Sequence, residues 1–175
     1  MFFKKKKYEI ISHDIYQKIV KFSRNKIFFT KYKVPDTIDG RFDMLVLSMI
    51  IVVYRLSKIN DEGVELSQKI FDIVFKDLDF SLRELGAGDV SVSTNMKKLI
   101  SSYMGRQKSY IKSFKNDDEK SLASAFEKNI YRNNDQHKSL SLSLSKKILK
   151  INKKFDLVDD KKILDSDFEL SIDFL

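Results

Sequence analysis

Apolar positions recur along this chain with the period of a helix. Between residues 62 and 85, for example, Leu66, Ile70, Val74 and Leu78 stand four apart, which places them on one helical face. Similar stripes occur in five further segments, so we predict an all-α fold, a single globular bundle of about six helices. The expected helices cover about 12–25, 40–58, 62–85, 89–114, 118–131 and 139–155.

The segment 40–58 differs from the others because it is apolar on nearly all sides. A helix without a polar face is surrounded by protein, so we predict that this helix is central. Pro35 keeps the preceding residue out of a helix, and Asp36, Thr37 and Asp39 offer oxygen acceptors to the first N–H groups of the helix. For the first helix, Ser12 or Asp14 is the expected cap.

The stretch SLRELGAGDVSVS, residues 81–93, separates two long helical patterns. Gly86 can adopt the left-handed conformation that ends many helices, and Asp89, Ser91 or Ser93 can cap the next one. We therefore predict a turn between two helices at this point. Gly105, inside the following helix, suggests that another helix packs closely against it.

Charge divides the chain unevenly around a net value of +8 over 175 residues. Residues 1–33 carry ten basic and two acidic side chains, whereas residues 156–175 carry seven acidic and two basic ones. The length suits one core. We predict a basic N-terminal segment (1–11), an all-helical domain (12–155) and a loosely ordered acidic tail (156–175), which could cover the basic end.

The N-terminal segment pairs two aromatic residues with four lysines. Such a sequence can lie at an anionic membrane surface, and ribosomal RNA would attract the same lysines. The longest apolar stretch, 44–54, is about half of the roughly 20 residues that a spanning helix needs, so we expect a soluble or peripheral protein. The residues expected to contact the membrane or the ribosome are Phe2, Phe3, Lys4, Lys5, Lys6 and Lys7.

Few residues suit catalysis, metals or cofactors. The chain has no cysteine, its two histidines lie on distant segments, and no glycine-rich phosphate loop is present. Asp39 and Asp43 stand four apart, which leaves a small magnesium-dependent helical enzyme as a remote alternative. We expect no catalytic residue, no metal site and no cofactor; the carboxylates should instead cap helices or pair with Arg41, Arg83 and Arg106.

Four blocks of sequence occur in the order found in one known family: VPDTIDGRFDMLVL, FDIVFKDLDFSLRELGAGDVSV, YMGRQKSY and KNIYRN. Across about 34–133 the chain resembles the ubiquinol–cytochrome c chaperone family. The second block is the most specific, since it combines an aspartate pair, S-L-R-E and a G-x-G-D turn. The last predicted helix and the acidic tail match poorly.

The resemblance implies an assembly chaperone that performs no reaction. Such a protein binds newly synthesised cytochrome b and promotes assembly of ubiquinol–cytochrome c reductase, respiratory complex III. The chain looks like a bacterial-type member, which would act in the cytoplasm, peripheral to the inner membrane (in the mitochondrial matrix if eukaryotic). A general helical adaptor at a membrane or ribosome surface is the alternative, and it would not prefer cytochrome b.

A client with many membrane helices needs an apolar surface with a polar rim. The polar residues at the two helix junctions within the matching blocks are therefore our candidates for client binding. The alternative is that they form a buried network of ion pairs that fixes the helices. The residues concerned are Asp39, Arg41, Asp43, Arg83, Glu84, Gly88, Asp89 and Arg106.

Overall fold

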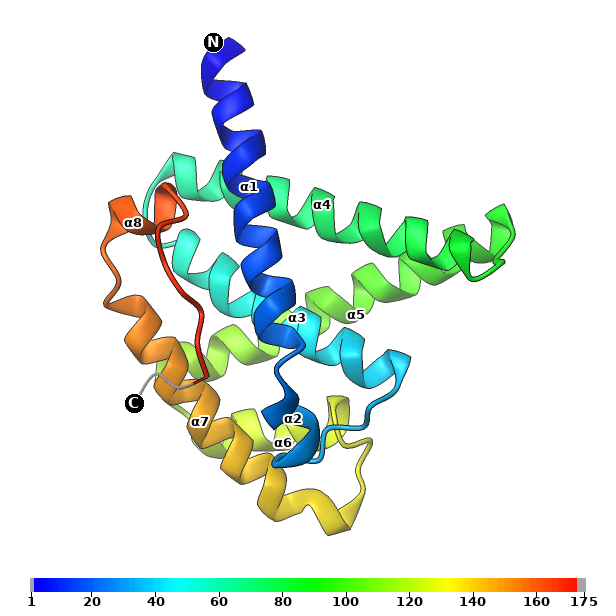
Figure 1. The fold of residues 1–175 in the computed structure, drawn as a ribbon. Coiled ribbons are helices and arrows are strands. Elements are labelled where there is room, and N and C mark those ends of the chain that lie inside the picture. Colours follow the sequence, from blue (N-terminus) through cyan, green and yellow to red (C-terminus); the bar gives the residue numbers. More distant parts are fainter. Residues whose placement is uncertain (1, 173–175) are drawn as a thin grey trace.

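The computed structural model describes residues 2–172, except for the side chains of 2–5 and 135. Six long helices and no strand occur in this part of the chain, which confirms the all-α prediction (Figure 1). Two five-residue helices, α2 and α8, and one 3-10 turn, η1, were not predicted. The elements are α1 (Phe2–Ser23), α2 (Lys26–Thr30), α3 (Ile38–Leu56), α4 (Asp61–Glu84), α5 (Asp89–Asn116), α6 (Glu119–Asn129), η1 (Asp135–His137), α7 (Lys138–Asp156) and α8 (Asp160–Leu164).

Helix α3 is the centre of the bundle, as its composition predicts. Every residue from Val46 to Leu56 is buried, and α1, α4, α5 and α7 all contact this helix. The Thr37 hydroxyl accepts a hydrogen bond from the Gly40 N–H and caps the start of α3. Helices α6 and α7 pack against each other and close one side of the core.

Helix α1 begins ten residues before the expected cap. Tyr8 and Ile11 are buried and extend the apolar stripe of the helix toward the N-terminus. The Ser12 hydroxyl does not cap anything; it donates to the Glu9 carbonyl oxygen within the helix. The expected boundary at residue 11 therefore falls inside a continuous helix. Its first turns extend past the rest of the molecule (Figure 1).

The acidic C-terminal segment packs against the bundle, so the expectation of a loosely ordered tail was wrong. Ile163, Phe168, Leu170 and Ile172 are buried, and the Phe168 ring meets the Phe155 ring edge-on at 5.1 Å. These apolar residues stand among acidic ones. Because the segment is so rich in charge, its sequence does not indicate that they belong to the core.

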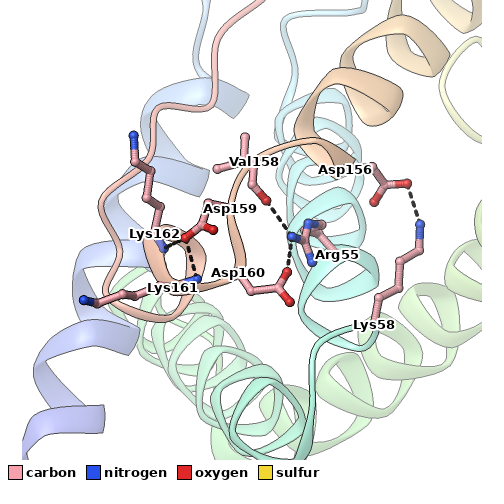
Figure 2. A network of polar contacts seen from close by, with 8 residues as sticks. All are labelled: Arg55, Lys58, Asp156, Val158, Asp159, Asp160, Lys161 and Lys162. Carbon is pink, nitrogen blue, oxygen red and sulfur yellow. Dashed lines mark hydrogen bonds and ion pairs between the residues drawn. The ribbon is translucent and has the colours of Figure 1, made fainter.

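Ion pairs hold this segment against α3 (Figure 2). Arg55, whose side chain is nearly buried, donates to the Val158 carbonyl oxygen at 2.6 Å and to Asp160 at 2.5 Å. Lys58 pairs with Asp156 at 2.5 Å. In the middle of the segment, Asp165 pairs with Lys7 of α1 at 3.0 Å, so the acidic segment contacts the basic helix, as its charge suggested.

Candidate functional site

The turn between α4 and α5 lies at the tip of a hairpin that projects from one side of the bundle (Figure 1). The Gly86 N–H bonds to the Arg83 carbonyl oxygen, and the Ala87 N–H bonds to the Leu82 carbonyl oxygen. Gly86 has a φ of 85°, so it supplies the left-handed residue of a Schellman motif, as predicted. Gly88 follows as the N-cap of α5.

Three large apolar side chains face solvent at this tip. Phe80 is 58% exposed, Leu85 is 71% exposed and Val90 is 84% exposed. We call these three residues the apolar tip. Burying them would remove apolar area from water, which favours binding to another apolar surface. Sequence reasoning missed them, although Leu85 and Val90 flank the predicted turn, because helical periodicity does not reveal which apolar residues remain uncovered.

Arg83 links the two helices beneath the apolar tip. Its Nε lies 2.7 Å from Asp79 of α4, and its Nη1 contacts Asp89 of α5. The hydrogen bond to Asp79, followed in size by the one to Asp89, raises the pKa of Arg83 above its ordinary value. The predicted cap role of Asp89 is wrong: Asp89 is the first residue of α5, and its carboxylate turns back to Arg83.

A second group of predicted residues lies inside the molecule. The Asp43 side chain is fully buried; one of its carboxylate oxygens lies 2.7 Å from Arg106 and the other lies 2.8 Å from Arg132. Burial raises the pKa of Asp43, although both guanidinium groups act in the opposite direction. The arrangement joins α3, α5 and the loop after α6, which is the kind of network that the structural alternative expects for Asp43 and Arg106.

Sequence reasoning did not single out Arg132. The residue stands in the quoted block KNIYRN, but nothing there connects it to Asp43, 89 positions earlier. Arg132 and Asn133 adopt positive φ values of 55° and 59°, and this turn directs Arg132 back toward α3. Arg106 also contacts the Ser102 hydroxyl within α5.

The remaining four candidates lie at the start of α3 and at the hairpin turn. Asp39 and Arg41 are exposed on the first turn of α3, and Arg41 pairs with Asp36 at 2.7 Å. Glu84 and Gly88 are exposed at the hairpin turn with Arg83 and Asp89. The eight predicted residues therefore form an exposed group at the turn, the largely buried ion pair of Asp43 and Arg106, and an exposed pair on α3. Asp39 and Arg106 line a common hollow, but no residue of the turn lines it.

A hollow of about 240 Å³ lies between α1, α3 and α4, near the base of the hairpin. Phe42, Leu45 and Leu78 contribute apolar surface to it, and Ile38 stands exposed among its lining residues. Tyr16 donates to Asp77 at 2.6 Å on its wall, and burial together with this hydrogen bond raises the pKa of Tyr16. This hollow and the apolar tip are thus both available to an apolar segment.

Within the described residues, no group of three or more histidine, cysteine or acidic side chains is arranged to hold a metal ion. Asp72 accepts from Gln68, and Asp77 and Asp79 have the separate partners described above. His137 stacks on the Tyr131 ring at 5.2 Å. Across residues 2–172, no helix has the combined length and apolarity required to span a membrane.

Two comparisons with known proteins, one of sequence and one of structure, point to the same family over most of the chain. A sequence model of the family described as ubiquinol-cytochrome C chaperone matches residues 30–170, and thus includes α7 and α8, which sequence reasoning left out of the resemblance. The crystal structure of the Cbp3 homolog from Brucella abortus is similar, with 32% sequence identity and a TM-score of 0.88. That comparison covers 98% of this chain and 95% of the other. No curated protein sequence matches significantly.

Proposed function

The chain belongs to the ubiquinol–cytochrome c chaperone family, and on this premise we propose that it binds newly synthesised cytochrome b. Membership supports a role in the assembly of respiratory complex III and favours a chaperone over an enzyme. Binding of cytochrome b in particular is our proposal, and it rests on the surface chemistry of the hairpin. No cofactor is part of the proposal.

The observation that carries the proposal is the apolar tip. Leu85 is exposed on the turn, and Phe80 and Val90 are exposed on the helices that flank it. The Schellman motif and the ion pairs of Arg83 fix the backbone of this turn. A fixed apolar surface with a charged rim can hold an apolar helix without ordering a loop first, which lowers the entropy cost of binding. A newly made membrane protein offers such helices before its partners cover them.

The hollow beside the hairpin extends the proposed client surface. Ile38 and Phe42 lie on α3, so a client segment that rests on the apolar tip can continue toward the base of the hairpin. Arg83, Glu84, Gly88 and Asp89 rim this surface, and Asp39 and Arg41 lie at its α3 end. Asp43 is buried and cannot touch the client; it would support the surface from inside by holding Arg106, which is mostly buried.

The proposal includes peripheral contact with an anionic membrane at the cytoplasmic face of the bacterial inner membrane. The first turns of α1 extend past the bundle, where Lys6 and Lys7 are exposed (Figure 1). The side chains of Phe2, Phe3, Lys4 and Lys5 lie outside the described residues. A contact with the ribosome would use the same basic turns, and it would place the chaperone close to a client as it emerges.

Site-specific photocrosslinking in living cells tests the client surface. A photoreactive amino acid at Leu85 or Val90 should trap cytochrome b, identified by mass spectrometry. The matched control is Leu157, which is 86% exposed but lies at the end of α7, far from the hairpin. Equal trapping from Leu157, or trapping of many membrane or ribosomal proteins without enrichment of cytochrome b, would contradict the proposal and favour a general adaptor.

Charge substitutions at the hairpin provide a second test. Arg83→Ala and Asp89→Ala remove an exposed ion pair, so both variants should melt as the wild type does, because exposed pairs contribute little to stability. If the pair holds the two helices in the binding arrangement, both variants should capture less cytochrome b. Normal capture by both would remove these two residues from the site.

A further inference from the structure

A basic hollow of about 430 Å³ opens between α3, α5, α6 and the loop after α6. None of the hairpin residues from 80 to 90 lines it, although it shares Asp39 and Phe42 with the α3 end of the proposed client surface. The residues that matter for its chemistry are Asp39, Phe42, Lys98, Arg106, Lys128 and Arg132. We refer to this site as the basic hollow.

Positive charge is in excess at the basic hollow. Four cationic side chains line it, and the only carboxylates among its described neighbours are Asp39 on the wall and Asp43 beneath, which leaves a net charge of +2. Lys98 and Lys128 form no ion pair with any residue from 2 to 172, unlike Lys58 and Lys153, which pair with aspartates. A concave surface with one sign of charge attracts the opposite ion.

The two arginines retain donors after Asp43 is satisfied. A guanidinium group has five N–H donors, and Arg132 uses one nitrogen for Asp43 while its side chain stays 46% exposed. Arg106 is 11% exposed, and its buried Nε has no hydrogen-bond partner in the described structure. Asp43 thus holds both guanidinium groups in place at the wall of the hollow and leaves part of their hydrogen-bonding capacity unused.

Gly105 lies beside the basic hollow. A neighbouring hollow shares Ser102, Arg106, Lys128 and Asn129 with the basic hollow and is also lined by Gly105. Glycine destabilises a helix interior relative to alanine, yet a Cβ at position 105 would meet no atom within 4 Å. The expectation of close helix packing at Gly105 was therefore wrong.

We propose that the basic hollow binds a phosphate group, carried either by a small phosphate ester or by a phospholipid headgroup. Guanidinium groups match phosphate oxygens with paired donors, and lysines add point charges at the rim. The net charge of +2 balances a phosphate monoester dianion. The hollow is larger than a phosphate alone requires, and Phe42 and Leu99 offer apolar contact to the remainder of the molecule.

The test measures binding of inorganic phosphate by calorimetry and by thermal unfolding, with sodium chloride at matched ionic strength as the reference. The double variant Lys98→Gln/Lys128→Gln should weaken phosphate binding about tenfold, since each lysine beside an anion contributes a few-fold. Both residues are on the rim, so the variant should fold normally. The matched control is Lys108→Gln/Lys120→Gln, which makes the same charge change on α5 and α6 outside both hollows.

Vesicles of phosphatidylcholine with and without phosphatidic acid separate the two sources of phosphate. Stabilisation by millimolar inorganic phosphate that the Lys98/Lys128 variant loses supports a soluble ester. Binding only to vesicles with phosphatidic acid, weakened in the same variant and kept in the control, supports a headgroup. If neither probe binds beyond the chloride reference, or if both double variants weaken binding equally, the proposal is wrong, because only general attraction by the net charge would then remain.

Discussion

Removing the Asp43 carboxylate should strongly destabilise the protein. In Asp43→Ala, Arg106 would keep its charge at a position where its side chain is 11% exposed, without its partner. Breaking a buried ion pair in this way costs about 3–5 kcal/mol. Arg132 is 46% exposed and can turn to water, so the loss of its ion pair should add less than about 1 kcal/mol to the destabilisation. The sum is a large part of the roughly 5–15 kcal/mol that stabilises a typical domain.

Urea denaturation followed by circular dichroism at neutral pH measures this loss. A second variant, Asp43→Ala/Arg106→Met, removes the stranded charge as well and should recover about 2 kcal/mol or more. Arg132→Ala should cost much less than Asp43→Ala. A loss below about 1 kcal/mol in Asp43→Ala, or no recovery in the double variant, would refute the view that Asp43 compensates a buried arginine.

Three further predictions concern stability. Burial raises the pKa of Asp43, so the free energy of unfolding of the wild type relative to Asp43→Asn should be greatest in acid, below the unfolded value of about 3.9, and should fall as pH rises through the folded pKa. Gly40→Ala should cost at least about 2 kcal/mol because its Cβ would lie 1.9 Å from a backbone oxygen, whereas Gly105→Ala should stabilise by about 0.5–1 kcal/mol in thermal melts. Asp160→Asn should cost about 1–2 kcal/mol in urea denaturation, since the buried Arg55 loses a charged partner (Figure 2).

Each of these predictions has a contrary result. A wild-type advantage over Asp43→Asn that grows with pH would mean that the two guanidinium groups outweigh burial. Destabilisation by Gly105→Ala would show that the glycine is needed for the fold. Asp167→Asn alters an exposed aspartate of the same C-terminal segment; an equal loss there and in Asp160→Asn would point to net charge as the cause.

Local signals in the sequence predicted most helix limits correctly. Thr37 caps α3, and Gly86 ends α4 with its positive φ, as expected. These effects act over three or four residues, so they can be recognised without knowing the fold. The predicted start of α1 was wrong, because a serine can occur at a cap or inside a helix. Only the burial of Tyr8 and Ile11 shows that the helix extends toward the N-terminus.

The candidate site was only partly accessible from the sequence. The matching blocks drew attention to these residues, but they could not distinguish the largely buried pair of Asp43 and Arg106 from the exposed pair of Arg83 and Asp89. Exposure depends on which helices cover a residue. The same reason explains why the apolar tip was missed.

By itself, the sequence determined that this chain is helical, that 40–58 is its central helix and that a turn lies at Gly86, because periodicity, capping and backbone sterics act within one or two helical turns. Only the tertiary structure decided that Arg132 meets Asp43 and that Arg55 holds the acidic segment. These pairs join residues 89 and 103 positions apart. Such contacts cannot be recognised from the spacing of residues in the sequence, because their geometry depends on how whole helices pack and not on the identity of neighbouring residues.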